Sequence, residues 1–128
     1  MQAIKKYSNE QQKAVYRQEE IERPSAPAAD EVQIKIKCIG ICTSDVHVLH
    51  GTMQMPDGNT VCHEFSGTVV AAGTNCATDF PVDQKVICEL AVGACFECPM
   101  CATGHYEFCP QKKPPGWASQ GVYTEYIN

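Results

Sequence analysis

The chain has 128 residues, with 10 Lys or Arg against 15 Asp or Glu and a net charge of −5. This length predicts a single domain, residues 1–128, that is large enough to bury a core. The acidic balance argues against a nucleic-acid partner, and no apolar run is long enough to cross a bilayer. With no secretory leader, we expect a cytoplasmic protein in which the nine cysteines stay reduced.

Short alternation of apolar and polar residues dominates the first third of the chain. We expect an opening pair of strands at residues 1–6 and 13–18, followed by an extended connector that contains Pro24 and Pro27. Residues 31–39, EVQIKIKCI, then predict a half-buried strand. The side chains expected on its apolar face are Val32, Ile34, Ile36 and Cys38.

The rest of the chain continues with short strands and a single short helix. The helix is expected at residues 44–50, with Ser44 or Thr43 as its N-cap. Strands are expected at residues 65–72, 85–90 and 121–127. Many short strands separated by turn signals predict a mainly β fold that resembles a compact barrel.

Four cysteines form the most specific motif of the chain. Their order is C-x-x-C-x-x-C-x₇-C, at Cys95, Cys98, Cys101 and Cys109. Two-residue gaps let a tight turn aim neighbouring thiolates at one point, and the longer gap lets the chain return with a fourth ligand. Four thiolates at about 2.3 Å are the ligand set of a closed, structural zinc site. Because the surrounding loop has little apolar material, the metal is expected to hold this lobe together.

Two other interpretations of these cysteines are open. A disulfide framework conflicts with the odd number of cysteines and the lack of a leader. An iron–sulfur cluster of the bacterial ferredoxin type needs a final gap of three residues before a Cys-Pro pair. Cys109 is followed by Pro110, but the gap here is seven residues. Structural zinc is therefore the preferred interpretation.

Two further segments contain metal-binding residue types. One is ICTSDVH at residues 41–47, and the other is VCHEFSG at residues 61–67. Together they offer thiolate, imidazole and carboxylate groups, the donors of catalytic zinc sites. Spacing alone does not show that these segments meet. On spacing, Cys42 reads as a small buried apolar residue and His63 as a core histidine.

Six blocks in order resemble the N-terminal, GroES-like catalytic domain of the zinc-dependent medium-chain alcohol dehydrogenases, and they look closest to the polyol and threonine dehydrogenase branches. The resemblance covers nearly the whole chain and implies a partly open β-barrel with short helices and a zinc-binding lobe. The blocks are MQAIKKY, DEVQIKIKCIGICTSDVH, CHEFSGTVVAAG, FPVDQKVICE, the four-cysteine lobe and QGVYTEYI.

The resemblance also implies roles for individual residues. Cys42 and His63 would be ligands of a catalytic zinc, and Glu64 a direct or water-mediated ligand. Asp45 would accept a hydrogen bond from the far ring nitrogen of His63, which fixes the tautomer of a ligand histidine. Ser44 would hydrogen-bond the substrate hydroxyl, and His47 would pass the proton to solvent. Without the resemblance, Ser44 reads as a helix cap, Asp45 as a partner of the helix dipole and His47 as a surface imidazole.

The activity that the resemblance implies is hydride transfer between an alcohol, polyol or carbonyl substrate and NAD or NADP. No G-x-G-x-x-G run is present, so we expect the cofactor to bind to a nucleotide-binding domain absent from this chain. The chain alone is then expected to lack activity and to hold its catalytic zinc weakly or not at all. Relatives of this kind are commonly oligomers. The alternative is a zinc-stabilised β domain that binds a partner and catalyses nothing.

Some residues depart from the family pattern. Cys62 stands where the family usually has glycine before the histidine, and Asp83 replaces a usual turn glycine. The side chain of Cys62 would either crowd the zinc loop or offer an extra thiolate. Cys38 and Cys88 have no motif partner and are expected to face the core.

Overall fold

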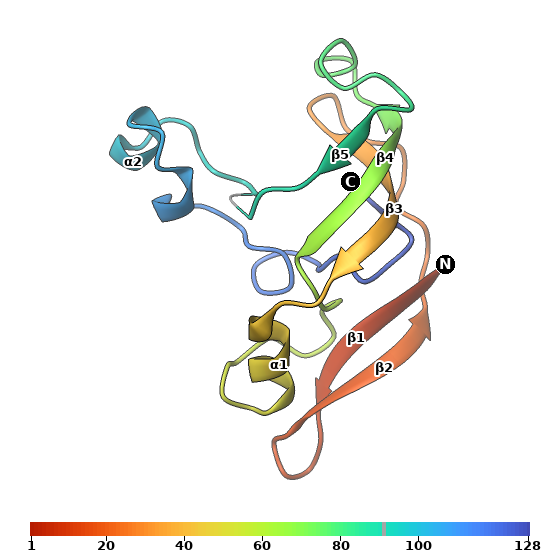
Figure 1. Cartoon of the computed structure of the whole chain (residues 1–128), viewed down its shortest axis with the longest axis vertical. Helices are drawn as coiled ribbons and strands as arrows, with labels where there is room; N and C mark the ends of the chain where they lie inside the picture. Colours follow the sequence, from red (N-terminus) through yellow and green to blue (C-terminus); the bar gives the residue numbers. More distant parts are fainter. Residues whose placement is uncertain (91) are drawn as a thin grey trace.

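Two antiparallel sheets make up the fold (Figure 1). The structure is a computed structural model that describes residues 1–90 and 92–128. The first sheet is the hairpin of β1 (Gln2–Ser8) and β2 (Ala14–Glu20). The second has four strands in the order β5 (Lys85–Ile87), β4 (Glu64–Ala72), β3 (Val32–Gly40) and β6 (Tyr126–Ile127). The mainly β expectation is confirmed.

The pairing of β3 with β4 positions the core. Along β4, the buried residues Phe65, Gly67 and Val69 alternate with half-buried Ser66, Thr68 and Val70. This two-residue period places one face inward and leaves the other outward. Ile34 of β3 joins the buried cluster, as its alternation predicted.

The prediction that Cys38 faces the core is wrong. The register between β3 and β4 shifts between Ile36 and Cys38. An irregularity of this kind redirects the side chains that follow it, and Cys38 is exposed. Cys88 does pack against the core cluster as a half-buried residue.

Two of the predicted strands are shorter than expected. The strand expected at residues 85–90 ends at Ile87. Of residues 121–127, only Tyr126–Ile127 forms a strand. The residues just before Tyr126 instead pair irregularly with the segment that leads to His63. Gly121 N donates to Thr60 O and Val122 N donates to Cys62 O, each at 3.0 Å. A Cβ on Gly121 would lie 2.1 Å from Thr60 O, so this close approach requires glycine.

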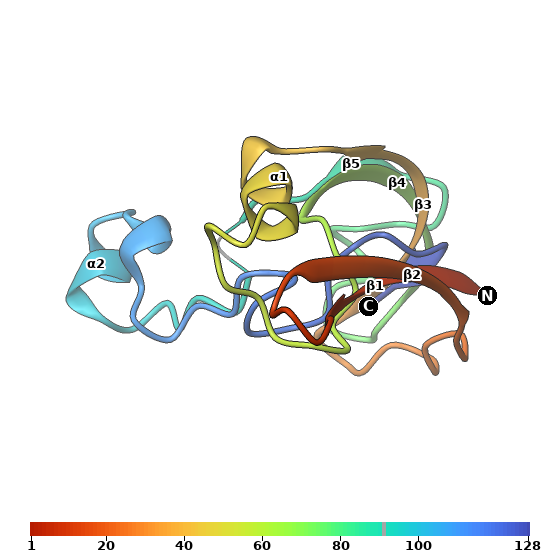
Figure 2. The ribbon, with the colours of Figure 1, turned by 90° about the horizontal axis from the view of Figure 1, so that it is seen from below.

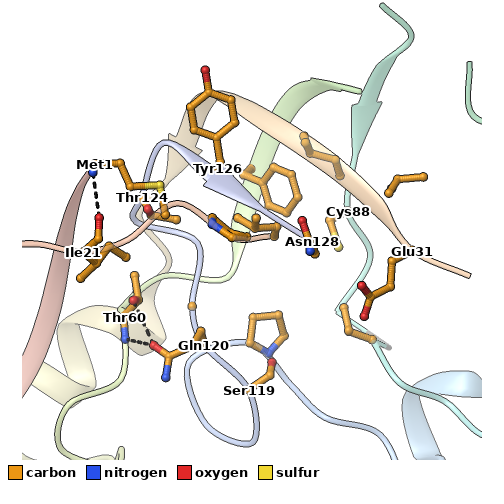
Figure 3. A pocket seen from close by; sticks show the side chains of 18 of the residues that line it. Met1, Ile21, Glu31, Thr60, Cys88, Ser119, Gln120, Thr124, Tyr126 and Asn128 are labelled. Atoms are coloured by element: carbon orange, nitrogen blue, oxygen red, sulfur yellow. Dashed lines mark hydrogen bonds between the residues drawn. The ribbon is translucent and has the colours of Figure 1, made fainter. Parts of the chain in front are cut away.

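The barrel is only partly closed. Single bridges, Ala3 with Thr124 and Lys5 with Thr60, connect the hairpin to the rest of the fold. A cavity of about 860 Å³ lies between the sheets (Figure 3). Gln120 spans part of its wall, where its Oε1 accepts hydrogen bonds from the backbone and hydroxyl of Thr60 at 3.0 and 3.1 Å. This architecture agrees with the partly open barrel that the sequence predicted.

The helices are short and lie outside the barrel. They are α1 (Thr43–Leu49), α2 (Pro99–Ala102) and the 3₁₀ helix η1 (Tyr106–Phe108). Within the described part of the chain, no helix has the length and hydropathy of a membrane span. The lobe that contains α2 and η1 projects well away from both sheets (Figure 2). The N-cap of α1 is Cys42, not Ser44 or Thr43 as expected.

Candidate metal centres

The four cysteines of the lobe converge on one point. Cys98 is the N-cap of α2, whose first residue is Pro99, and Cys101 lies within that helix. Cys109 directly follows η1, and Cys95 precedes the α2 turn. The four Sγ atoms all lie within 4.8 Å of one another. The turn between the first cysteines and the return through η1 therefore bring together four ligand atoms.

The sulfur separations suit a bound ion. The Sγ of Cys95 lies 3.6 Å from that of Cys109 and 4.0 Å from that of Cys101. Zinc–sulfur bonds of about 2.3 Å in a tetrahedron place the sulfurs about 3.8 Å apart. A disulfide would need about 2.0 Å, and all nine cysteines are free thiols. The group can hold zinc, and the disulfide interpretation does not fit.

Backbone N–H groups donate hydrogen bonds to two of the four sulfurs. Cys95 N donates to Cys109 Sγ at 3.4 Å, and Cys98 N donates to Cys95 Sγ at 3.3 Å. The N–H of Cys95 is the main reason why the pKa of Cys109 falls to about 6. Burial instead raises the pKa of Cys101 to about 12. Metal binding requires deprotonated sulfur. The hydrogen bond to Cys109 therefore favours its metal-binding form, whereas Cys101 would lose its proton only when the ion binds.

A second group of ligand atoms forms where α1 meets the start of β4. It consists of Cys42, the N-cap of α1, together with His63 and Glu64. One ligand atom from each lies within 4.8 Å of the others. Thiolate, imidazole and carboxylate are all zinc donors, and three protein ligands leave a position for water or substrate. None of the three residues lines the large barrel cavity.

His63 is buried with its two nitrogens facing different partners. Its side chain is only 7% exposed. Nε2 lies 3.8 Å from Glu64 Oε1 and 3.5 Å from Ser44 Oγ, on the side of the ligand group. Nδ1 points toward Asp45 Oδ1 at 3.8 Å. The histidine thus offers Nε2 to the group and turns Nδ1 toward the carboxylate.

The expected hydrogen bond between His63 and Asp45 is not formed in this geometry. A separation of 3.8 Å is too long for one, and Nδ1 is a buried polar atom without a partner among the described residues. Asp45 uses its other oxygen, Oδ2, to accept the backbone N–H of Cys42 at 2.9 Å. The carboxylate therefore fixes the backbone of one ligand residue while it faces the ring of another.

His47 lies on the outside of α1. It follows Ser44 by three residues, which is one helical turn. Its side chain is exposed, and Nδ1 lies 3.2 Å from Thr52 Oγ1. Ser44 thus lies beside the ligand group, and His47 is open to solvent one turn further along α1.

A comparison with known proteins agrees with the fold and with the two groups of metal-ligand atoms. The sequence profile described as "Alcohol dehydrogenase GroES-like domain" matches residues 28–128. The chain belongs to this family.

Relatives of this GroES-like domain include several dehydrogenases. Sorbitol dehydrogenase from Halalkalibacterium halodurans is 34% identical over 83% of this chain and 31% of the relative. Galactitol-1-phosphate dehydrogenase from Escherichia coli superposes with a TM-score of 0.85 at 29% identity, over 99% of this chain and 35% of that structure. A structure described as a short chain alcohol dehydrogenase from E. coli CFT073, complexed with NADH, gives a TM-score of 0.77 at 29% identity, with 99% and 35% coverage. The chain spans about a third of the length of these proteins.

The departures from the family pattern have structural consequences in this GroES-like domain. Cys62 has a φ of +64° and Asp83 a φ of +73°, a region where glycine is the usual residue. Cys62 is buried, and that burial, followed by the charge of Asp45, raises the pKa of its thiol to about 12. Cys62 is not a member of the ligand group. It is a buried thiol beside the site that lies outside the group of ligand atoms.

Two residues beside the histidine were missed by sequence reasoning. Trp117 places its ring 5.6 Å from that of His63, and its Nε1 donates to Gln54 O at 2.7 Å. Tyr16 donates its hydroxyl to the backbone carbonyl of Asp45 at 2.8 Å. Burial raises the pKa of Tyr16 to about 12, so it remains a donor. Neither residue belongs to a motif, since both reach the site only through the folding of distant segments.

Proposed function

We propose that this domain is the catalytic part of a zinc-dependent oxidoreductase that transfers a hydride between an alcohol or polyol and NAD or NADP. The observation that carries the proposal is the meeting of Cys42, His63 and Glu64 beside Ser44, in a domain of the alcohol dehydrogenase GroES-like family. The second part of the proposal is that the four-cysteine group holds a structural zinc.

The three residues of the site would hold the catalytic zinc through one sulfur, one nitrogen and one carboxylate oxygen. Zinc supplies Lewis acidity, which lowers the pKa of a bound hydroxyl. Glu64, with a side chain 49% exposed, is the most open of the three and serves as a direct or water-mediated ligand. Asp45 serves as a positioning residue, because it holds the backbone of Cys42 and faces Nδ1 of His63.

Proton movement is assigned to residues of α1. Ser44 Oγ lies on the Nε2 side of His63 and would hydrogen-bond the substrate hydroxyl. One turn further, His47 is exposed to water and would release the proton to solvent. An imidazole can both accept and donate a proton through its ring nitrogens, which suits this role.

The nicotinamide cofactor is assigned to a nucleotide-binding domain outside residues 1–128. Support comes from the alcohol dehydrogenase complexed with NADH, of which this chain covers 35%. Sorbitol and galactitol-1-phosphate dehydrogenases support a polyol substrate. Nine free thiols suit the reducing cytoplasm. Association of the complete enzyme into an oligomer is part of the same proposal.

The test uses cobalt, a coloured substitute for zinc, in the metal-depleted chain. Cobalt should bind to both groups of ligand atoms. A polyol such as sorbitol should then shift the visible absorption bands of the cobalt bound in the group that contains His63. His63→Ala should abolish that shift and leave the sulfur-rich spectrum intact, while the exposed His105→Ala control should retain both. Trp117 is the only tryptophan, so quenching of its emission reports occupancy of the neighbouring site.

Two outcomes would overturn parts of the proposal. A loaded His63 site whose spectrum ignores alcohols and aldehydes would favour a zinc-stabilised binding module without catalysis. Steady NAD-dependent turnover by residues 1–128 alone would contradict the assignment of the cofactor to another domain.

A further inference from the structure

The outer face of the four-stranded sheet carries a groove that the metal chemistry does not use. It has a volume of about 740 Å³ and lies over β3, β4 and β5. These three strands run side by side in Figure 1. Its floor is formed by Ser66, Thr68 and Val70, the half-buried residues that alternate with the core residues of β4. The groove is therefore on the opposite side of the sheet from the hydrophobic core.

Three lysines surround this floor. The strand register pairs Lys35 with Thr68 and Thr68 with Lys85, so these residues form a row across three strands. Lys37 lies two residues beyond Lys35, at the irregularity of β3, and also lines the groove. Adjacent strands are about 4.8 Å apart, which places Lys35 and Lys85 on either side of the Thr68 hydroxyl. Long side chains at that spacing can reach one shared anion.

In the part of the chain that the structure describes, no carboxylate lies within 4.0 Å of the three ammonium groups. Among the described residues, the lysines that form ion pairs within 4.0 Å of a carboxylate are Lys5 and Lys6. Asp83 is the one acidic residue on the groove wall. The groove is thus positive in a chain whose net charge is −5. Three exposed cations around two hydroxyl donors form a surface complementary to a compact anion.

We propose that this groove binds the phosphate group of a small phosphorylated molecule. Its volume lies in the range of small-molecule sites, about 300–1,000 Å³. Lysine supplies point charges for phosphate, and Ser66 and Thr68 supply hydroxyl donors between them. An extended polyanion such as nucleic acid does not fit, because the acidic remainder of the chain would repel it.

The proposed site is separate from the candidate metal centres. None of Cys42, His63 and the four lobe cysteines lines the groove. Phosphate binding is therefore expected with or without zinc at the His63 group. This independence separates the proposal from the dehydrogenase function, since either can fail while the other holds.

The test is a titration of the isotopically labelled full chain with glycerol 3-phosphate and, separately, inorganic phosphate, followed by amide NMR at low ionic strength. The amides of Ser66, Thr68 and Lys85 should shift in a saturable way, and neutral glycerol should leave them unchanged. Lys35→Gln/Lys85→Gln should weaken binding about tenfold, because two contacts between exposed charges, each worth about threefold, are lost together. Added salt should weaken binding by screening.

The matched control is Lys5→Gln/Lys13→Gln, which changes the net charge equally outside the groove. It should bind the phosphate ester as the wild type does. Three results would overturn the proposal. They are equal weakening of binding in both double variants, chemical-shift changes spread over the whole surface, and no saturation at 10 mM ligand, which is about the weak limit for a specific small-molecule site. Binding of an acidic peptide by the groove, with no response to either phosphate, would also overturn it. Unchanged amide spectra away from the groove will show that the variants are folded.

Discussion

At the scale of single residues, Lys6 shows how one buried charge supports the His63 segment. Its side chain is 7% exposed, and Nζ donates to Met55 O at 2.9 Å, to Asp57 Oδ1 at 2.7 Å and to Ser8 Oγ at 3.1 Å. Its backbone carbonyl also accepts the N–H of Gly58. A buried ammonium is tolerated only when it is paired and hydrogen-bonded. Lys6 thus ties β1 to the segment that leads to His63.

Asp57→Asn should lower the urea midpoint of unfolding at pH 7, because the buried ammonium loses its charged partner. The hydrogen bond from Lys6 lowers the pKa of Asp57. The ion pair is therefore complete above the usual Asp pKa of about 3.9 and is lost as the pH falls through the lower folded value. The difference in urea midpoint between wild type and variant should disappear in that acidic range. Asp79→Asn, at an exposed position, should show no such difference at either pH.

Asp83→Gly should raise the free energy of unfolding by about 0.5–1 kcal/mol, because glycine removes the cost of a left-handed conformation. Asp83 is exposed with a φ of +73°, so no packing is lost. Gly51→Ala is the mirror control, since Gly51 has a φ of +76° and open space around its Cβ position. It should destabilise by a similar amount in urea unfolding. Loss of stability in Asp83→Gly would contradict the strain argument.

At the scale of elements, the four-cysteine lobe is a short loop with little apolar burial of its own. Its buried cluster contains only Ala94, Cys101 and Cys109, with Cys95 and Cys98 packed against it. Phe96 and Phe108 are 71% and 67% exposed, so the lobe buries few of its aromatic groups. Apolar burial on this scale cannot offset the entropy of ordering the loop. An ion bound by the four cysteines would supply the missing stabilisation.

Cys109→Ser should reduce bound zinc by about one equivalent per chain, since a structural site needs all four thiolates. The β-sheet signal in circular dichroism should persist, because the lobe projects away from the barrel (Figure 2). Cys76→Ser is the control, as Cys76 is a half-buried thiol outside both ligand groups. Full zinc content in Cys109→Ser would show that the lobe does not hold the ion.

At the scale of the whole molecule, the barrel and the lobe are held by different forces. The barrel cluster is apolar and continuous, with Val48, Val61 and Val122 at most 1% exposed. Each such buried side chain contributes about 1.5–3 kcal/mol of transfer free energy. The lobe has no comparable cluster. Metal removal should therefore affect the two parts unequally.

Chelation should increase hydrogen exchange in residues 95–109 by about tenfold or more, while amides such as those of Val69 and Val122 keep their protection. The physical reason is that the lobe would lose the cross-link that a bound ion provides, whereas the barrel retains its apolar core. Exchange mass spectrometry with and without chelator measures this directly. Simultaneous loss of protection in both parts would mean that the ion stabilises the entire fold.

The sequence by itself determined the features that depend on neighbouring residues. Alternation along residues 31–39 and 65–72 predicted β3 and β4, because a strand places every second side chain on one face. The C-x-x-C-x-x-C spacing predicted that the lobe sulfurs meet, because a short turn fixes their separation. The ligand set of Cys42, His63 and Glu64 came from family resemblance and not from spacing.

Only the tertiary structure decided the features that join distant segments. Three such features depend on strand register or loop packing. They are the irregularity of β3 that exposes Cys38, the position of Trp117 beside His63, and the row of Lys35, Thr68 and Lys85. Register is set by the hydrophobic pattern of both strands, by turn geometry and by the balance between the faces that the whole fold buries. No short stretch of sequence contains that balance, so these arrangements exist only once the chain has folded.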